Sequence, residues 1–144
     1  MAKNFRFTLE SLLKLRSYTA EIKKTALAEI IRLREDQDRL IQEKQQYLVS
    51  ITDTGYARTT VAGAMQAAHT HRESVKGEIT VLYRKQKQLS EIEQLRRKEY
   101  SEALKEVKVL EKLKERQKDA YRAEMNREEQ QFLDETARRI ASIK

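Results

Sequence analysis

Residues 9–51 read LESLLKLRSYTAEIKKTALAEIIRLREDQDRLIQEKQQYLVSI, and apolar side chains return in this stretch every seven residues. This period is typical of an α-helix that packs along another helix, whereas a disordered chain keeps no register over six heptads. Three positions of the heptad form the stripe, and polar residues interrupt all of them. The first holds Leu12, Thr19, Ala26, Leu33, Leu40 and Tyr47; the second, three residues earlier, holds Leu9, Arg16, Lys23, Ile30, Gln37, Lys44 and Ile51; the third, one residue after the first, holds Leu13, Ala20, Leu27, Arg34, Ile41 and Leu48. We therefore expect a helix over about residues 9–51, with Thr8 as its N-terminal cap.

The pattern breaks over residues 52–59, which read TDTGYART. Gly55 adopts a positive φ at little cost, and Thr and Asp side chains favour bonds to nearby backbone over a helix. Thr59 or Thr60 can cap a following helix. We expect the chain to reverse here; the alternative is a local break within one long helix.

A second helix is expected over about residues 60–141. Its first part, residues 60–74, is rich in small residues that either admit a close neighbour or pack weakly. From Val75 the period of seven resumes in three positions. The first holds Val75, Leu82, Leu89, Arg96, Ala103, Leu110 and Gln117; the second holds Ile79, Gln86, Glu93, Tyr100, Val107, Lys114 and Tyr121; the third holds Lys85, Ile92, Glu99, Glu106, Leu113 and Ala120.

These elements predict one all-α domain over residues 1–144, an antiparallel two-helix coiled-coil hairpin with a longer second helix. If the chain reverses at Gly55, the first helix pairs with roughly residues 60–105. The last thirty-odd residues then extend past the pairing with Met125, Phe132 and Leu133 still on them. Exposed apolar surface of this kind marks a partner site.

Composition agrees with long helices and limits the function. The 144 residues include three glycines, no proline and no cysteine, so no disulfide or Cys zinc site is possible. The net charge of +7 is spread evenly: residues 1–51 carry 10 Lys/Arg against 7 Asp/Glu, and residues 52–144 carry 20 against 16. Interleaved charges are typical of a solvated helix face, so nucleic-acid binding is not expected, although a basic nucleic-acid-binding protein stays an alternative.

No catalytic or cofactor-binding motif is present. His69 and His71 are two residues apart and point to different faces of a helix, so a metal site is not expected. No phosphate-binding glycine motif occurs, and a two-helix hairpin offers no deep cleft. We expect no enzyme activity and no cofactor. No apolar run is long enough for a transmembrane segment and the start lacks a signal peptide, which predicts a cytoplasmic protein.

The run Phe5–Arg16, FRFTLESLLKLR, resembles the opening of the bacterial flagellar export protein family FliJ. The resemblance extends over essentially the whole chain. It implies a coiled coil similar to the γ subunit of rotary ATPases, located in the cytoplasm and peripherally at the inner membrane of the flagellar base. It further implies binding to the hexameric export ATPase FliI, to the cytoplasmic domain of the export gate protein FlhA and to export chaperones, coupling ATP hydrolysis to secretion.

The resemblance also places these contacts on the chain. The ATPase contact would comprise Leu9, Leu12, Leu13, Arg16, Phe132 and Leu133, and the export-gate contact Leu40, Tyr47, His71 and Val75. Arg16 falls in the stripe, where its charge needs solvent or an acidic partner. A different class of function stays open: a structural coiled coil that homodimerises to cover its interrupted stripe.

Overall fold

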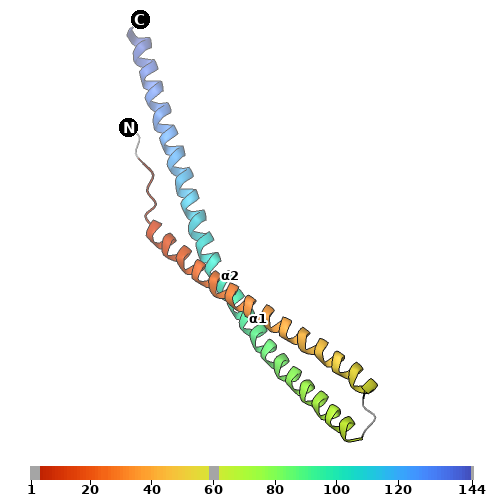
Figure 1. Cartoon of the computed structure of the whole chain (residues 1–144). Coiled ribbons are helices and arrows are strands. Elements are labelled where there is room, and N and C mark those ends of the chain that lie inside the picture. Colours follow the sequence, from red (N-terminus) through yellow and green to blue (C-terminus); the bar gives the residue numbers. More distant parts are fainter. Residues whose placement is uncertain (1–3, 59–61, 144) are drawn as a thin grey trace. The chain divides into compact units, whose positions relative to one another are not determined.

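The computed structural model describes residues 4–58 and 62–143, which form two helices. Helix α1 spans Glu10–Arg58 and helix α2 spans Ala62–Ile143 (Figure 1). The structure confirms the predicted fold class: an antiparallel two-helix coiled-coil hairpin whose second helix is the longer one. No strand occurs in the described residues.

The helix ends differ from the prediction. At the start, Glu10 donates its amide to the Phe7 carbonyl at 3.1 Å, and the first α-helical bond runs from Leu13 to Leu9. At the other end, α1 continues to Arg58, so residues 52–58, predicted as turn, are helical.

The helix can pass through these residues because their preference for a turn is small. The hydroxyl of Thr52 donates to the Leu48 carbonyl at 2.8 Å and so stays bonded within the helix. A glycine inside a helix costs only about 1 kcal/mol, which tertiary pairing can offset. The proposed caps Thr59 and Thr60 lie outside the described residues.

Helix α2 is continuous through the part that the sequence left unclear. Residues 62–74 are helical, and a Cβ added at Gly63 would meet nothing within 4 Å. Of the two interpretations of these small residues, weak packing therefore holds at Gly63.

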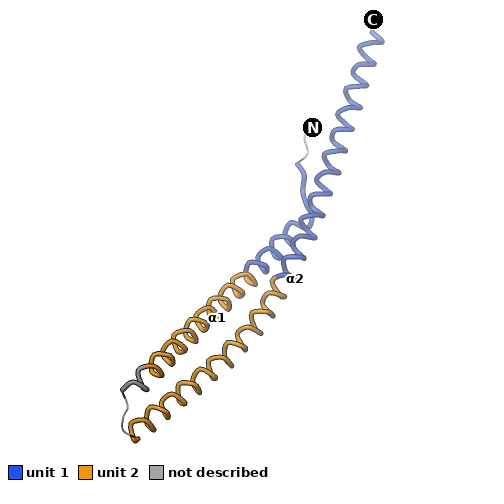
Figure 2. Tube along the Cα trace, turned by 90° about the vertical axis from the view of Figure 1, so that its right-hand side faces the viewer, with its two compact units in different colours: residues 1–21, 101–144 blue, residues 22–100 orange. Residues whose placement is uncertain are grey.

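The contacts divide the chain into two units, each made from both helices (Figure 2). Unit 1 comprises residues 1–21 and 101–144, and unit 2 comprises residues 22–100. The expectation of a single domain stays a prediction.

Unit 1 has an apolar core between its two helical segments. The cluster holds Phe7, Leu13, Ala20, Ala103 and Val107, with Phe5, Leu110 and Leu113 packed against it. Ion pairs flank the core: Glu10 with Lys114 at 2.8 Å, and Arg16 with Glu106 at 3.6 Å. Their numbering rises on α1 as it falls on α2, so the segments are antiparallel.

The pairing in unit 1 reaches further along α2 than expected. The ring of Phe5 lies 5.7 Å from that of Tyr121, sixteen residues past the predicted limit at residue 105. Beyond Tyr121, the described residues are exposed except Met125, which is half-buried. The difference follows from the longer α1, which moves its N-terminal partner towards the end of α2.

In unit 2, the two helices pack through residues of mixed polarity. Ile41, Val75 and Ile79 are buried, but so are Gln37 and Glu93, at 3% and 7% exposure. Two of the three positions predicted for α2 thus supply buried residues, whereas Ile92 of the third position is 39% exposed. On α1, the position that contains Ile41 packs, whereas Leu33, Leu40 and Tyr47 are 52%, 46% and 44% exposed at the edge of the contact.

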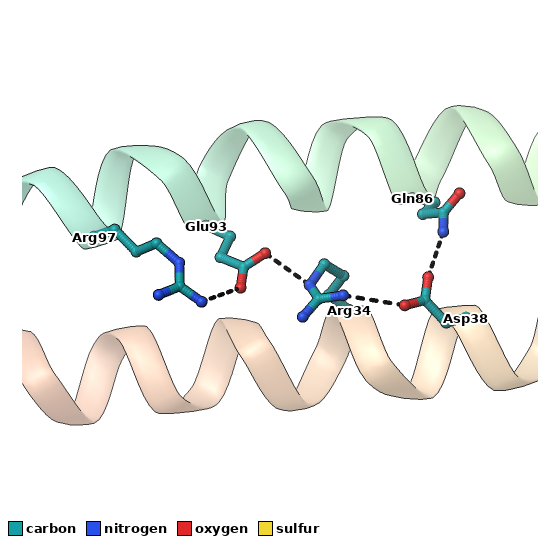
Figure 3. Close-up of polar contacts among 5 residues, drawn as sticks. All are labelled: Arg34, Asp38, Gln86, Glu93 and Arg97. Carbon is teal, nitrogen blue, oxygen red and sulfur yellow. Dashed lines mark hydrogen bonds and ion pairs between the residues drawn. The ribbon is translucent and has the colours of Figure 1, made fainter.

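A polar network occupies the middle of this contact (Figure 3). Arg34 Nε lies 2.7 Å from Glu93 Oε2 without hydrogen-bond geometry, and Arg34 also pairs with Asp38. Arg97 donates to Glu93 at 3.0 Å, and Gln86 donates to Asp38. Buried polar groups need hydrogen-bond or ion-pair partners, so they favour the one alignment of two helices that pairs them over alignments shifted along the axis. We interpret the network as a device that fixes the register of the hairpin.

Candidate functional site

The described residues form exposed surfaces and shallow open hollows. Residues 4–58 and 62–143 contain no group of three or more His, Cys, Asp or Glu side chains that could hold a metal ion. Neither helix, within those ranges, is apolar enough over a sufficient length to cross a bilayer. The candidate site residues are the ten residues predicted for partner contacts.

The four N-terminal residues proposed for the ATPase contact differ in accessibility, and Leu9 directly precedes α1. Leu13 is buried in the core of unit 1, so it supports the surface without forming it. Leu12 is half-buried, and Leu9 is exposed. Arg16 keeps a partly exposed side chain, and its guanidinium lies 3.6 Å from Glu106. The acidic partner that a charge in the stripe requires is thus supplied within the chain itself.

The two α2 residues of the same predicted contact lie apart from these. Phe132 and Leu133 are 67% and 53% exposed on the part of α2 that follows Tyr121. Lys114, which pairs with Glu10, precedes Phe132 by 18 residues, about 27 Å along a helix axis. The structure does not bring the two halves of the predicted contact together, although both lie in unit 1.

The second predicted site is brought together in unit 2. The Tyr47 hydroxyl lies 3.0 Å from Nε2 of His71, and the two rings meet edge-on with centroids 6.0 Å apart. Leu40 lies seven residues before Tyr47 on the same edge of α1 and is exposed. Val75 is 2% exposed and packs beneath this surface, where a partner could not reach it without opening the helices.

Sequence reasoning did not assign a role to the ion pair beside this site. Lys44 lies 2.8 Å from Glu78, with its ammonium also 5.8 Å from the centre of the Tyr47 ring. The hydrogen bond from Lys44 lowers the pKa of Glu78, and the same bond raises the pKa of Lys44. The opposite charges of Lys44 and Glu78 could have indicated this ion pair, but only if the pairing of the two helices had been predicted correctly.

One comparison with known proteins gives a match. A family model described as Flagellar FliJ protein matches residues 5–144. No curated protein and no solved structure matches the chain. The match covers both helices and all ten predicted contact residues.

Proposed function

The chain belongs to the FliJ family, and from this premise we propose that it is the adaptor that joins the export ATPase to the export gate. Membership makes it a non-enzymatic component of the flagellar export apparatus. The finer proposal has two contacts on two surfaces: one in unit 1 for the ATPase FliI, and one in unit 2 for the cytoplasmic domain of FlhA.

The observation that carries the ATPase contact is the apolar surface at the end of α2. Phe132, Leu133, Ile140 and Ile143 are all exposed, and α1 does not cover them. A helix with large exposed apolar side chains is typical of a segment that is buried in a complex. We place the main ATPase contact on Phe132 and Leu133, with Leu9, Leu12 and Arg16 as its second part.

The gate contact is supported by the exposed group formed by Leu40, Tyr47 and His71. A tyrosine at the edge of a helix pair offers an apolar ring and a hydroxyl to a partner. Its contact with His71 holds the two side chains in a fixed mutual position. The roles in coupling ATP hydrolysis to secretion, in chaperone binding and at the inner membrane follow as further parts of the proposal.

Binding to purified FliI tests the ATPase contact. Phe132→Ser combined with Leu133→Ser removes exposed apolar area and should weaken binding by at least tenfold, about 1.4 kcal/mol. Val109→Ser is the matched control, because Val109 is 66% exposed and lies in the same unit. Circular dichroism should show the same helicity for both variants. Equal ATPase binding by the double variant and the control would overturn this assignment.

A further inference from the structure

The two sides of the helix contact in unit 2 differ in chemistry. On one side, polar side chains join the helices: Gln45 donates to Tyr83 at 2.6 Å, and Asp38 accepts from Gln86. Each of these hydrogen bonds joins a side chain of α1 to a side chain of α2. The other side is identified by the contacts of Tyr47 with His71, Lys44 with Glu78 and Lys23 with Glu99.

Apolar side chains lie on this other side between the ion pairs. Leu33 and Leu40 precede Tyr47 by whole heptads, and Ile92 follows His71 by three heptads and precedes Glu99 by one. The heptad holds along this part of α2, since Ile79 and Glu93, two heptads apart, are both buried. Leu33, Leu40 and Ile92 therefore share one side of the hairpin, and all three are exposed.

The margins of this side differ on the two helices. On α2, Val81 follows Glu78 by three residues, and Leu95 follows Ile92 by three residues. Val81 and Leu95 extend the apolar surface outward and are 60% and 55% exposed. Leu95 and Ile92 also line a shallow open hollow with Gln88 and Glu91. We call the set Leu33, Leu40, Val81, Ile92 and Leu95 the apolar face.

On α1, the margin of the apolar face is acidic. Glu29, Asp36 and Glu43 recur every seven residues. They lie four residues before Leu33, Leu40 and Tyr47, respectively. Asp36 pairs with Arg39 at 2.8 Å. The row spans 14 residues, about 21 Å along the helix. An apolar floor with carboxylates along one edge fits an amphipathic helix that has cations along one edge.

We propose that the apolar face of unit 2 binds a single amphipathic helix of another protein, with Lys or Arg side chains aligned on Glu29, Asp36 and Glu43. The inference extends the proposed gate surface at Leu40 and Tyr47, and in that respect it rests on the proposed function. It commits to a helix of about 14–18 residues that completes a three-helix contact.

Charge argues against a second copy of this chain as the occupant. Two copies can be laid face to face with α1 opposite α2, or with α1 opposite α1. In the first arrangement, the acidic margin meets the margin that carries Val81 and Leu95, which offers no row of cations. In the second, the acidic margin meets itself, and like charges repel.

Two synthetic 18-residue helical peptides test the proposal with the full chain. They share one leucine face and differ only along one edge, which carries Lys in one peptide and Glu in the other. Fluorescence anisotropy at low salt should show at least tenfold tighter binding of the Lys peptide, with a preference that falls as salt screens the charges. Binding of neither peptide, or equal binding of both, would overturn the proposal.

Variants of the chain locate the contact. Leu33→Ser should weaken peptide binding by at least fivefold, whereas Val49→Ser, at a 61% exposed position of α1 outside the apolar face, should leave it unchanged. Glu29→Lys, Asp36→Lys and Glu43→Lys together should reverse the preference to the Glu peptide. Circular dichroism checks that each variant stays helical. An unchanged preference in the triple variant would contradict the proposed alignment.

Two further measurements distinguish this inference from homodimerisation and from the proposed function. Light scattering should show one chain per particle; a dimer that Leu33→Ser dissociates would assign the apolar face to a second copy and overturn the proposal. Binding of FlhA is measured separately. If the unmodified chain binds the Lys peptide but not FlhA, the proposed function alone is refuted. If it binds FlhA but neither peptide, this inference alone is refuted.

Discussion

The hydroxyl of Tyr47 on α1 lies 3.0 Å from Nε2 of His71 on α2, and this contact joins two residues that are 24 positions apart in the sequence. It lies above the buried Val75 and beside the Lys44–Glu78 ion pair. The contact therefore divides the residues of the proposed gate site by role: Tyr47 and His71 face outward, and Val75 supports them.

Replacing Tyr47 separates stability from binding. Tyr47→Phe removes one exposed hydrogen bond and should lower the free energy of unfolding by at most about 1 kcal/mol, measured by urea denaturation. Tyr47→Ser should cause a similarly small change in stability but weaken FlhA binding by about tenfold, because it removes the ring from the surface. FlhA binding by Tyr47→Ser at the wild-type affinity would remove Tyr47 from the gate contact.

Arg16 and Glu106 permit a charge-swap test of the ATPase contact. Arg16→Glu places a carboxylate beside Glu106, so weaker ATPase binding could arise from the partner or from the chain's own pair. Adding Glu106→Arg restores an opposite-charge pair within the chain. If Arg16 contacts the ATPase, the double variant should still bind about tenfold more weakly in a sedimentation assay. Full recovery of binding in the double variant would mean that Arg16 is structural.

Removing Glu93 should destabilise the hairpin. Glu93→Ala leaves Arg34 in the helix contact without its 2.7 Å partner, and Arg97 loses its acceptor as well. Since both arginines retain some contact with solvent, we expect a loss of about 2 kcal/mol in the free energy of unfolding. Glu91→Ala, an exposed neighbour on α2, should change it by less than about 0.5 kcal/mol. Equal effects of the two substitutions would contradict the role assigned to the network.

The Lys44–Glu78 pair predicts a stability that changes at acid and at alkaline pH. Because the pKa of Glu78 is lowered from 4.5, its contribution is present above that value and lost as the pH falls through the lowered pKa. Because the pKa of Lys44 is raised from 10.5, its contribution is present below that value and lost as the pH rises through the raised pKa. Thermal denaturation from pH 3 to 11 should show a smaller acid-side loss for Glu78→Gln than for wild type. An identical acid-side loss would exclude the pair as its source.

The two helices and the packed positions of α2 could be predicted from the heptads, because Val75, Ile79, Ala103 and Val107 keep one register. The position of the chain reversal could not. The turn-favouring residues around Gly55 predict the reversal there, but their local preference is worth only about 1 kcal/mol, and the structure keeps them in α1.

This shift explains why the cross-helix contacts were missed. Arg16 pairs with Glu106 and Lys44 pairs with Glu78, and the two residue numbers have the same sum in both pairs. A hairpin that reverses at Gly55 would pair each α1 residue with a residue about twelve positions earlier on α2 than these contacts do, so neither ion pair could be found. The heptads do not distinguish the three α1 positions for a related reason: with apolar residues in all three, only the placement of α2 decides that Ile41 is buried and Leu40 is not.

The central claim is that this chain acts as an adaptor on the export ATPase, and the number of chains per ATPase hexamer tests it most directly. Native mass spectrometry of the purified complex, with excess chain present, gives that number. A central, stalk-like contact predicts one chain per hexamer, and the Phe132→Ser, Leu133→Ser variant should reduce that occupancy. Six chains per hexamer, one on each subunit, would contradict the account.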